Sequence, residues 1–207
     1  MKRNMPTGPR PYHHGNLRAE LVDLGIEQMR HKDVSALTLR GLALLAGVSP
    51  MAPAHHFGTR RGLLAAIAAE GFRRLREFRE AFPGGSGNTS GDVIAHVHAC
   101  IAFAVEQPAL FRLMFGPEFG DKKDFPELAA AAAQGYVVFN ASVNRYFQVR
   151  GLPPPPGATA AVWAVMHGFA MLIMDQQSPP GGGVKPVEMV DQTLVFLLEG
   201  LASSLTR

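Results

Sequence analysis

The sequence predicts an all-α protein with an N-terminal three-helix head and a C-terminal helical body. Apolar residues recur at spacings of three and four along most of the chain, which is the period of a helix packed on a core. No stretch shows the alternation of a strand, and no internal repeat stands out. The 207 residues, of which 47% are hydrophobic, are enough to bury a core of their own.

The head begins with a helix predicted over residues 16–29, and a short helix predicted from Thr38 to Leu45 follows it. Thr38 is suited to the start of this short helix, because its hydroxyl can accept a hydrogen bond from a backbone N–H one turn in. Gly47 lies where the chain leaves the helix, and we expect it to have a positive φ, which costs glycine little.

A second short helix is predicted from Ser49 to His56. Ser49 is expected to cap it, and Pro50 is expected at the first helical position, where its missing N–H costs nothing. Pro53 lies inside this helix, where proline removes a backbone hydrogen bond unless it falls within the first turn. Two helices joined by a short turn that contains Gly form a helix-turn-helix, here residues 38–57.

A longer helix is predicted from Arg60 to about Ala81, with Thr59 as its cap. The second half of this helix is heavily charged, and we interpret it as a solvated helix face. The Gly- and Ser-rich stretch 82–91 is predicted to be a linker. On this division the head occupies residues 15–75 and the body occupies residues 92–207.

The body is predicted to be helical, with prolines and glycines separating its helices. The predicted bounds are Asp92–Glu106, Ala109–Phe115, Glu127–Arg150, Ala158–Met174 and Pro186–Leu205. Residues 118–124 are predicted to form an exposed, charged loop.

The helix-turn-helix resembles the DNA-binding motif of the TetR family of one-component transcriptional regulators. The matching residues are Thr38-Leu39-Arg40, Leu42-Ala43, Ala46-Gly47-Val48-Ser49, His56-Phe57, Arg60 and Leu63-Leu64. The wider chain is similar to one branch of that family, which has a Trp-x-x-x-His-Gly signature in its C-terminal domain. The residues that carry this similarity are Tyr12–Arg18, Pro108–Gly116 and Trp163–Gly168. The resemblance implies a DNA-binding head and an effector-binding, dimer-forming body.

The second short helix is expected to enter the major groove of DNA, where an α-helix fits and base edges are accessible. The residues assigned mainly to phosphate contacts are Thr38, Ser49, His56 and Arg60. The candidates for base or methyl contacts are Arg40, Pro50, Met51, Ala52 and His55. The resemblance supports Arg60, because these proteins usually carry a lysine at that position. Ala54 departs from the family, which usually has an aromatic residue there.

The distribution of charge fits an anionic partner at the N-terminal end. Residues 1–80 hold 13 Lys and Arg against 7 Asp and Glu, whereas residues 81–207 hold 7 against 10. Such an imbalance is common by chance, so it supports DNA binding only in combination with the helix-turn-helix.

Proteins with this motif bind paired half-sites as homodimers, about 34–36 Å apart along the duplex. The last two helices of the body are the predicted interface. The first of them carries small residues that allow close helix approach: Ala160, Ala161, Ala164, Gly168 and Ala170. The second carries an apolar stripe: Val190, Leu194, Leu197, Leu201 and Leu205. The alternative is that both stripes belong to an intramolecular core, and the resemblance favours the dimer.

Large apolar residues in the body suggest a cavity for a largely apolar small-molecule effector. The candidates are Phe103, Phe111, Met114, Phe115, Tyr136, Phe139, Trp163, His167 and Met171. For each of these residues singly, core packing is the commoner role. His167 is the sharpest candidate, although a histidine on an apolar helix is more often a core residue with its hydrogen bonds satisfied.

Metal, cofactor and enzyme classes find no support in the sequence. The histidine pairs are adjacent or two apart, so neither pattern places two imidazoles on one helical face. No carboxylate pair, nucleophile elbow or phosphate-binding loop is present. Cys100 is the sole cysteine, which excludes an internal disulfide and suits a reducing cytoplasm. No signal peptide or membrane span is expected.

The sequence therefore predicts a ligand-responsive transcriptional regulator, a repressor that binds a palindromic double-stranded DNA operator as a homodimer. The alternative is a non-DNA-binding helical dimer that acts as a small-molecule or partner-binding module. Pro53 and Ala54 motivate this alternative, because both depart from what the recognition helix usually carries.

Overall fold

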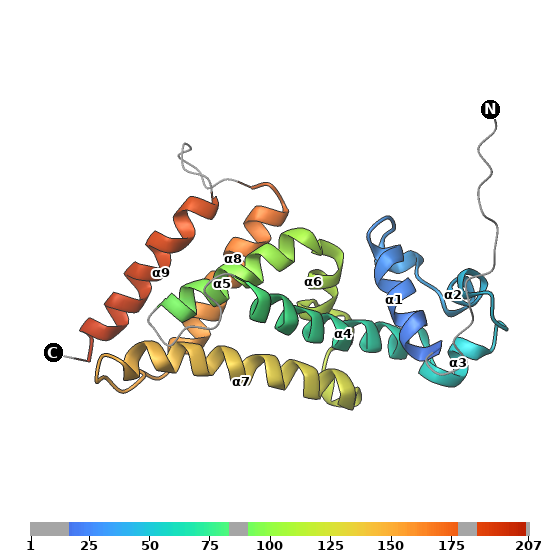
Figure 1. The fold of residues 1–207 in the computed structure, drawn as a ribbon, viewed down its shortest axis with the longest axis horizontal. Helices are drawn as coiled ribbons and strands as arrows, with labels where there is room; N and C mark the ends of the chain where they lie inside the picture. The colour runs from blue at the N-terminus through green and yellow to red at the C-terminus, as the bar shows by residue number, and fades with distance from the viewer. Residues whose placement is uncertain (1–16, 83–90, 178–185, 206–207) are drawn as a thin grey trace. The chain divides into compact units, whose positions relative to one another are not determined.

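The computed structural model describes residues 17–82, 91–177 and 186–205. Within these residues it contains nine α-helices, three short 3-10 helices and no strand, so the predicted all-α fold is confirmed (Figure 1). The predictions for Tyr12–Asn16, for most of the linker 82–91 and for the Pro- and Gly-rich stretch 179–183 lie outside the described residues. The chain divides into two compact units, Met1–Leu63 and Leu64–Arg207.

The first unit contains α1 (Leu17–Met29), the 3-10 helix η1 (Val34–Ala36), α2 (Leu39–Ala46) and α3 (Ala52–Phe57), and α4 begins at its end. α1 contacts both α2 and α3. The core of the unit includes the buried side chains of Leu21, Ile26, Leu42, Ala43 and Phe57. The guanidinium of Arg18 also lies 5.5 Å from the ring centroid of Phe57, which ties α1 to α3 through a cation–π contact.

Three of the predicted helix ends are confirmed. The Thr38 hydroxyl accepts a hydrogen bond from the Gly41 N–H at 3.0 Å and so caps α2. Gly47 ends α2 with a φ of +68°, and its N–H bonds to carbonyls of the last helical turn. Thr59 caps α4 in the same way as Thr38, because its hydroxyl accepts from the Gly62 N–H at 3.1 Å.

The predicted start of the second short helix is wrong. α3 begins at Ala52 instead of Ser49, and its N-cap residue is Met51, which makes no side-chain capping bond. The Ser49 carbonyl accepts from the Ala52 N–H at 3.0 Å, so Ser49–Ala52 form a turn. Pro50 occupies the second position of that turn, which its fixed φ favours. Pro53 consequently falls in the first turn of α3, where it is buried and disrupts no hydrogen bond.

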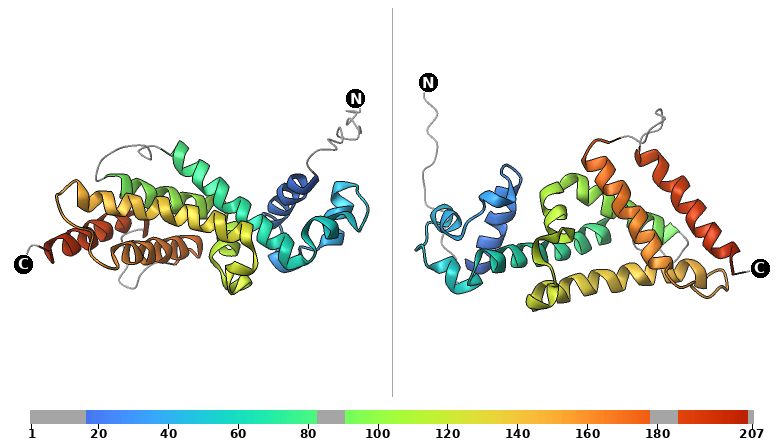
Figure 2. Two further views of the ribbon diagram at one scale, coloured as in Figure 1. Left: turned by 90° about the horizontal axis from the view of Figure 1, so that it is seen from below. Right: turned by 180° about the vertical axis from the view of Figure 1, so that it is seen from behind.

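The second unit holds most of α4 and the five helices that follow. Their bounds are α4 (Arg60–Ala81), α5 (Gly91–Glu106), α6 (Pro108–Phe115), α7 (Pro126–Gln148), α8 (Ala158–Met174) and α9 (Pro186–Ser203). α5 packs against α6, α7 and α8, while α8 packs against α7 and α9. α8 and α9 lie side by side, as the view from behind shows in orange and red (Figure 2, right). The predicted helices match these bounds to within two residues.

The predicted exposed loop is more structured than expected. It contains the 3-10 helices η2 (Pro117–Phe119) and η3 (Lys122–Asp124), and Phe119 is only 1% exposed. The Phe119 ring lies 5.7 Å from that of Phe125, edge to face. An apolar anchor therefore holds this otherwise charged segment on the second unit.

α4 and α6 approach each other closely at Gly71. A Cβ added at Gly71 would lie 2.6 Å from Met114 Sδ and 3.0 Å from Leu110 Cδ1. Any larger residue at Gly71 would have to displace the buried side chains of Met114 and Leu110, so glycine suits this close approach although its φ is helical.

No single helix among the described residues has the length and apolar character to cross a membrane. The pair α5 and α6 has enough of both when taken together, but it is bent by 115° at the break between them.

Candidate functional site

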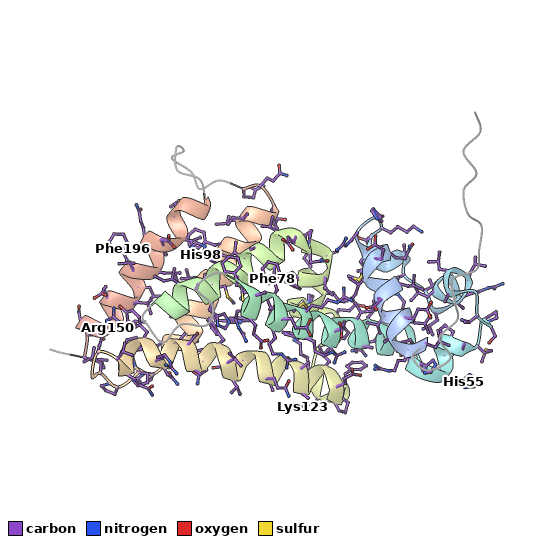
Figure 3. All side chains as sticks on the ribbon, viewed as in Figure 1. His55, Phe78, His98, Lys123, Arg150 and Phe196 are labelled. Atoms are coloured by element: carbon purple, nitrogen blue, oxygen red, sulfur yellow. The ribbon has the colours of Figure 1, made fainter. Side chains whose placement is uncertain are left out.

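Two regions of the molecule hold the predicted functional residues, an exposed surface in the first unit and a cavity in the second. The first is the helix-turn-helix. Most of its candidate residues are exposed: Thr38, Arg40, Ser49, Pro50, Met51, His55 and His56. Ala52 and Arg60 are half-buried. His55 lies on α3 at the outer edge of the first unit (Figure 3).

Arg40 and His55 are the side chains best placed to meet a partner. Within the described part of the chain, neither makes a hydrogen bond or an ion pair with another side chain. Met51 is 62% exposed and lies at the turn before α3. An exposed cation, an exposed imidazole and an exposed apolar side chain are thus available on α2, on α3 and at the turn between them.

Arg60 has a structural role that the sequence did not reveal. Its Nε donates to the Leu37 carbonyl at 2.8 Å, and its Nη2 donates to the Val34 carbonyl at 2.6 Å. These bonds join the start of α4 to the segment that precedes α2. A phosphate contact by Arg60 stays a prediction, since part of its donor capacity is already used.

The second region is a cavity of about 340 Å³ within the second unit. Residues of α4, α5, α6, η3, α7 and α8 surround it. Its lining consists of Phe72, Leu75, Arg76, Arg79, His96, Cys100, Phe115, Lys122, Ala132, Gly135, Tyr136, Phe139, Ala160, Trp163 and Met166. A space of this volume with mainly apolar walls is typical of a small-molecule site.

Four of the predicted ligand residues line the cavity: Phe115, Tyr136, Phe139 and Trp163. The other five lie outside its lining. Phe103, Phe111 and Met114 are at most 3% exposed and belong to the core. Met171 is 38% exposed, and its Sδ accepts from Arg112 Nη1 at 3.9 Å. Side-chain chemistry alone could not separate these sets, because cavity walls and core use the same residue types.

His167 lies among aromatic rings beside the cavity and does not line it. Its ring centroid is 4.0 Å from that of Trp163 and 4.5 Å from that of Phe115. Nδ1 lies 3.1 Å from the Trp163 carbonyl, to which it donates, so Nε2 is an acceptor. Nε2 is buried without a partner, and burial lowers the pKa of His167. His167 therefore differs from a core histidine with both ring nitrogens satisfied, and its contact with a ligand stays a prediction.

The interpretation of the charged half of α4 as a solvated face is wrong at Arg79. This residue is 7% exposed and borders the cavity. A signal was present in the sequence: Phe72, Leu75 and Arg79 follow one another at spacings of three and four. Helical periodicity therefore places Arg79 on the apolar side of α4.

A buried polar cluster surrounds Arg79. Arg79 Nη1 lies 3.5 Å from His96 Nε2, and a guanidinium can only donate, so His96 Nε2 accepts. The His96 proton is then on Nδ1, which lies 3.4 Å from Ser142 Oγ. The Ser142 hydroxyl in turn donates to the Phe139 carbonyl at 2.7 Å. This chain of donors holds the imidazole in one tautomer and one orientation.

The pKa values in this cluster follow from burial. Burial, and then the charge of Arg79, lowers the pKa of His96 to about 3, so the imidazole is neutral at physiological pH. Burial raises the pKa of Cys100 to about 12, which leaves its thiol protonated. Burial also lowers the pKa of Arg79, although an arginine remains charged.

The outward faces of α8 and α9 carry part of the predicted interface. On α8, Ala160, Ala164 and Gly168 are exposed, Ala161 is half-buried and Ala170 is buried. The apolar stripe of α9 is shifted from its predicted register. Its buried members are Val190, Leu194, Leu198 and Ala202, whereas Leu197 and Leu201 are half-buried and Leu205 is 36% exposed. The outer face of α9 instead presents Val195 and Phe196, the latter 76% exposed (Figure 3).

Among the residues that the structure describes, no group of three or more His, Cys, Asp or Glu side chains is arranged to hold a metal ion.

Comparison with known families gives one match. The family described as "Tetracyclin repressor-like, C-terminal domain" matches residues 93–197, slightly more than half of the chain. Comparison with curated proteins finds no match.

Solved structures with the same fold cover almost the entire chain. A protein of unknown function from Rhodococcus sp. RHA1 is 29% identical, with a TM-score of 0.77 over 94% of this chain and 100% of that one. The TetR family transcriptional regulator PfmR from Thermus thermophilus is 18% identical, with a TM-score of 0.57 over 87% and 98%. The TetR-like regulator LfrR from Mycobacterium smegmatis, solved in complex with proflavine, is 22% identical, with a TM-score of 0.57 over 88% and 94%.

Proposed function

Because the chain belongs to the tetracyclin repressor-like family, we propose that it is a ligand-responsive transcriptional repressor. It binds a palindromic DNA operator as a homodimer in the cytoplasm and leaves the DNA when a small molecule binds. The observation that carries this proposal is the exposed helix-turn-helix, capped at Thr38 and turned at Gly47. The head extends over residues 15–75 and the body over residues 92–207.

On this proposal α3 and the turn before it enter the major groove. Arg40, Met51 and His55 make base or methyl contacts, with Pro50 and Ala52 beside them. Thr38, Ser49 and His56 contact phosphates, which position the protein without reading sequence. The exposure of these side chains supports the assignment.

The effector occupies the cavity of the second unit. The complex of LfrR with proflavine supports the idea that this fold accepts a small molecule. We also propose that the chain belongs to the branch with the Trp-x-x-x-His-Gly signature. In this chain Trp163 lines the cavity and His167 packs against its ring.

Dimerisation uses the outer faces of α8 and α9. Exposed small residues on α8 and exposed apolar residues on α9 support a four-helix interface between two copies. The corrected register of α9 makes Phe196 a contact residue of this interface, in place of Leu205.

The proposed response to ligand is a linked equilibrium. The effector favours one conformation of the body, and the operator favours another. The coupling free energy equals the difference in the effector's affinity for the two conformations, and it is the same when measured from the DNA side. α4 is the candidate element for transmitting this coupling, because Arg79 near its end borders the cavity while Arg60 at its start hydrogen-bonds within the head.

DNA binding is tested by titrating duplexes from the region upstream of the chain's own gene at several salt concentrations. A plot of log affinity against log salt is expected to have a slope of about −0.9 per phosphate neutralised. Arg40→Ala is expected to cost about 1–3 kcal/mol on the specific duplex and to relax sequence preference. Arg30→Ala, an exposed change just after the end of α1 and outside the motif, is the matched control.

The alternative of a helical dimer that does not bind DNA has one observation in its favour, the engagement of Arg60 by backbone carbonyls. Arg60→Ala is a poor test, because it would also loosen the head. Arg40→Ala with His55→Ala changes two exposed side chains instead. If transcripts that depend on this gene are unaffected by the double change, the alternative is correct.

A further inference from the structure

The charged residues around the cavity are all cationic. Arg76, Arg79 and Lys122 border it, and no aspartate or glutamate is among its lining residues. The remaining lining is apolar, apart from the uncharged side chains of His96, Cys100 and Tyr136. Any molecule that fills this space meets a positive electrostatic field.

Arg79 is the cation of the cavity that is buried without a charged partner. Its side chain is 7% exposed, and its one hydrogen bond is to neutral His96. No carboxylate among the described residues forms an ion pair with it. Burial of a charged group is unfavourable unless the charge is paired, so this guanidinium lacks a counter-ion that its burial calls for.

The acidic residues nearest in sequence form no ion pair with Arg79, although the charge of Glu80 acts to raise the pKa of its guanidinium. Glu80 is an exposed side chain whose carboxylate lies 3.9 Å from Arg76 Nε. Glu77 is exposed on α4. Arg76 is itself 41% exposed at its side chain, so water already solvates its charge. The unmatched charge of the cavity therefore belongs to Arg79.

The polar cluster keeps Arg79 in place for a ligand. Because His96 is held as an acceptor by Ser142, it receives one N–H of the guanidinium and leaves the others for a second acceptor. A guanidinium presents its N–H groups in a planar fork that matches the two oxygens of a carboxylate.

We propose that the effector is an anionic amphiphile, whose carboxylate pairs with Arg79 and whose apolar body packs against Phe72, Phe115, Phe139 and Trp163. The inference rests on the proposed role of this cavity as the effector site, and it makes the site selective for acids. A neutral ligand of the same shape would leave the buried charge unpaired.

The test compares acids with neutral molecules of the same carbon skeleton. The probes are 4-phenylbutyrate with 4-phenylbutanol, 2-naphthylacetate with 2-(2-naphthyl)ethanol, and decanoate with 1-decanol. Binding to the purified full chain is measured by isothermal titration calorimetry at pH 7 without DNA. At least one acid is expected to bind about tenfold or more tightly than its alcohol, as a charge-assisted hydrogen bond predicts.

Two variants assign the effect to the buried guanidinium. Arg79→Gln is expected to abolish the preference for the acid while the alcohol binds as before. Arg74→Gln is the matched control, because Arg74 lies on the same helix and pairs with Glu70 away from the cavity. The control is expected to retain the preference.

The comparison of acid with alcohol in the unchanged protein tests whether the cavity prefers carboxylates, even if Arg79→Gln fails to fold. Equal affinities for every pair, or no binding by any acid, would overturn the inference. Because DNA is absent, the result is independent of operator binding: acids can bind tightly to a chain that proves to bind no operator, and the reverse can also occur.

Discussion

The two units of the chain use the same kinds of side chain in opposite environments. In the first unit Arg40 and His55 stand in solvent, on a surface set up by local hydrogen bonds such as the cap at Thr38. In the second unit Arg79 and His96 are buried next to each other in a cavity whose lining includes several aromatic rings. The residue type therefore does not decide the role, and the degree of solvation does.

This difference has consequences for recognition. A solvated arginine attracts a polyanion over distance, and salt screens the attraction within about 8 Å at physiological ionic strength. A desolvated arginine requires a counter-ion in contact with it and is screened much less. The first kind suits a duplex, and the second suits one small acid in a cavity.

The largest effect is expected where a buried ring of the second unit is removed. Phe111 is 1% exposed and packs on Phe115 at 4.7 Å, so Phe111→Ala is expected to cost about 3–5 kcal/mol of unfolding free energy. Leu44 of the first unit is 83% exposed, and Leu44→Ala is expected to change stability by less than about 0.5 kcal/mol. Urea denaturation measures both. Similar losses would contradict the assignment of the apolar residues to core and surface.

The next effect concerns the buried imidazole. The pKa of His96 is about 3 in the folded chain, and its ordinary value is 6.5, so the unfolded chain binds a proton that the folded chain does not. Stability from this residue is therefore complete above pH 6.5 and is lost as the pH falls from 6.5 towards 3. The loss approaches about 1.4 kcal/mol per pH unit within this window.

Denaturation of His96→Gln at several pH values tests this point. The variant is expected to lack the loss of unfolding free energy that His96 causes as the pH falls below its ordinary pKa of 6.5. His55→Gln, a change at an exposed histidine of the first unit, is the control and is expected to keep that loss. If the slope survives in His96→Gln, the buried imidazole is not its source.

A smaller effect separates two hydroxyl residues of the helix-turn-helix. Thr38→Ala removes an observed cap and is expected to cost about 1 kcal/mol. Ser49 caps nothing with its side chain, so Ser49→Ala is expected to cost less than about 0.5 kcal/mol. Thermal denaturation of both variants distinguishes the observed start of α3 from the one expected from sequence. Equal losses would favour a helix that begins at Ser49.

The smallest effect is expected at His167, which lies beside the cavity without lining it. His167→Phe removes a buried acceptor that has no partner, so stability is expected to change by less than about 1 kcal/mol and binding of the acid probes to remain unchanged. Trp163→Ala, a change within the lining, is expected to weaken that binding about fivefold or more. A loss of binding in His167→Phe would return this histidine to the list of ligand residues.

The sequence by itself determined the helices, their order and most of their ends. Caps such as Thr38 and Thr59, the positive φ of Gly47 and the prolines that begin α6 and α9 act on neighbouring residues. Their effects can therefore be inferred from a short window. The one wrong helix start, at Ser49, occurred where two local preferences compete, a serine cap and a proline turn.

The tertiary structure decided which side chains are buried, which line the cavity and which remain exposed. Phe111 and Phe115 lie on the same short helix, yet one belongs to the core and the other to the cavity wall. α9 buries Leu198 rather than Leu197, and Arg79 loses the solvent that its neighbour Arg76 keeps. These outcomes depend on where distant helices pack, because solvation is a property of the assembled surroundings and not of the residue or its neighbours in the chain.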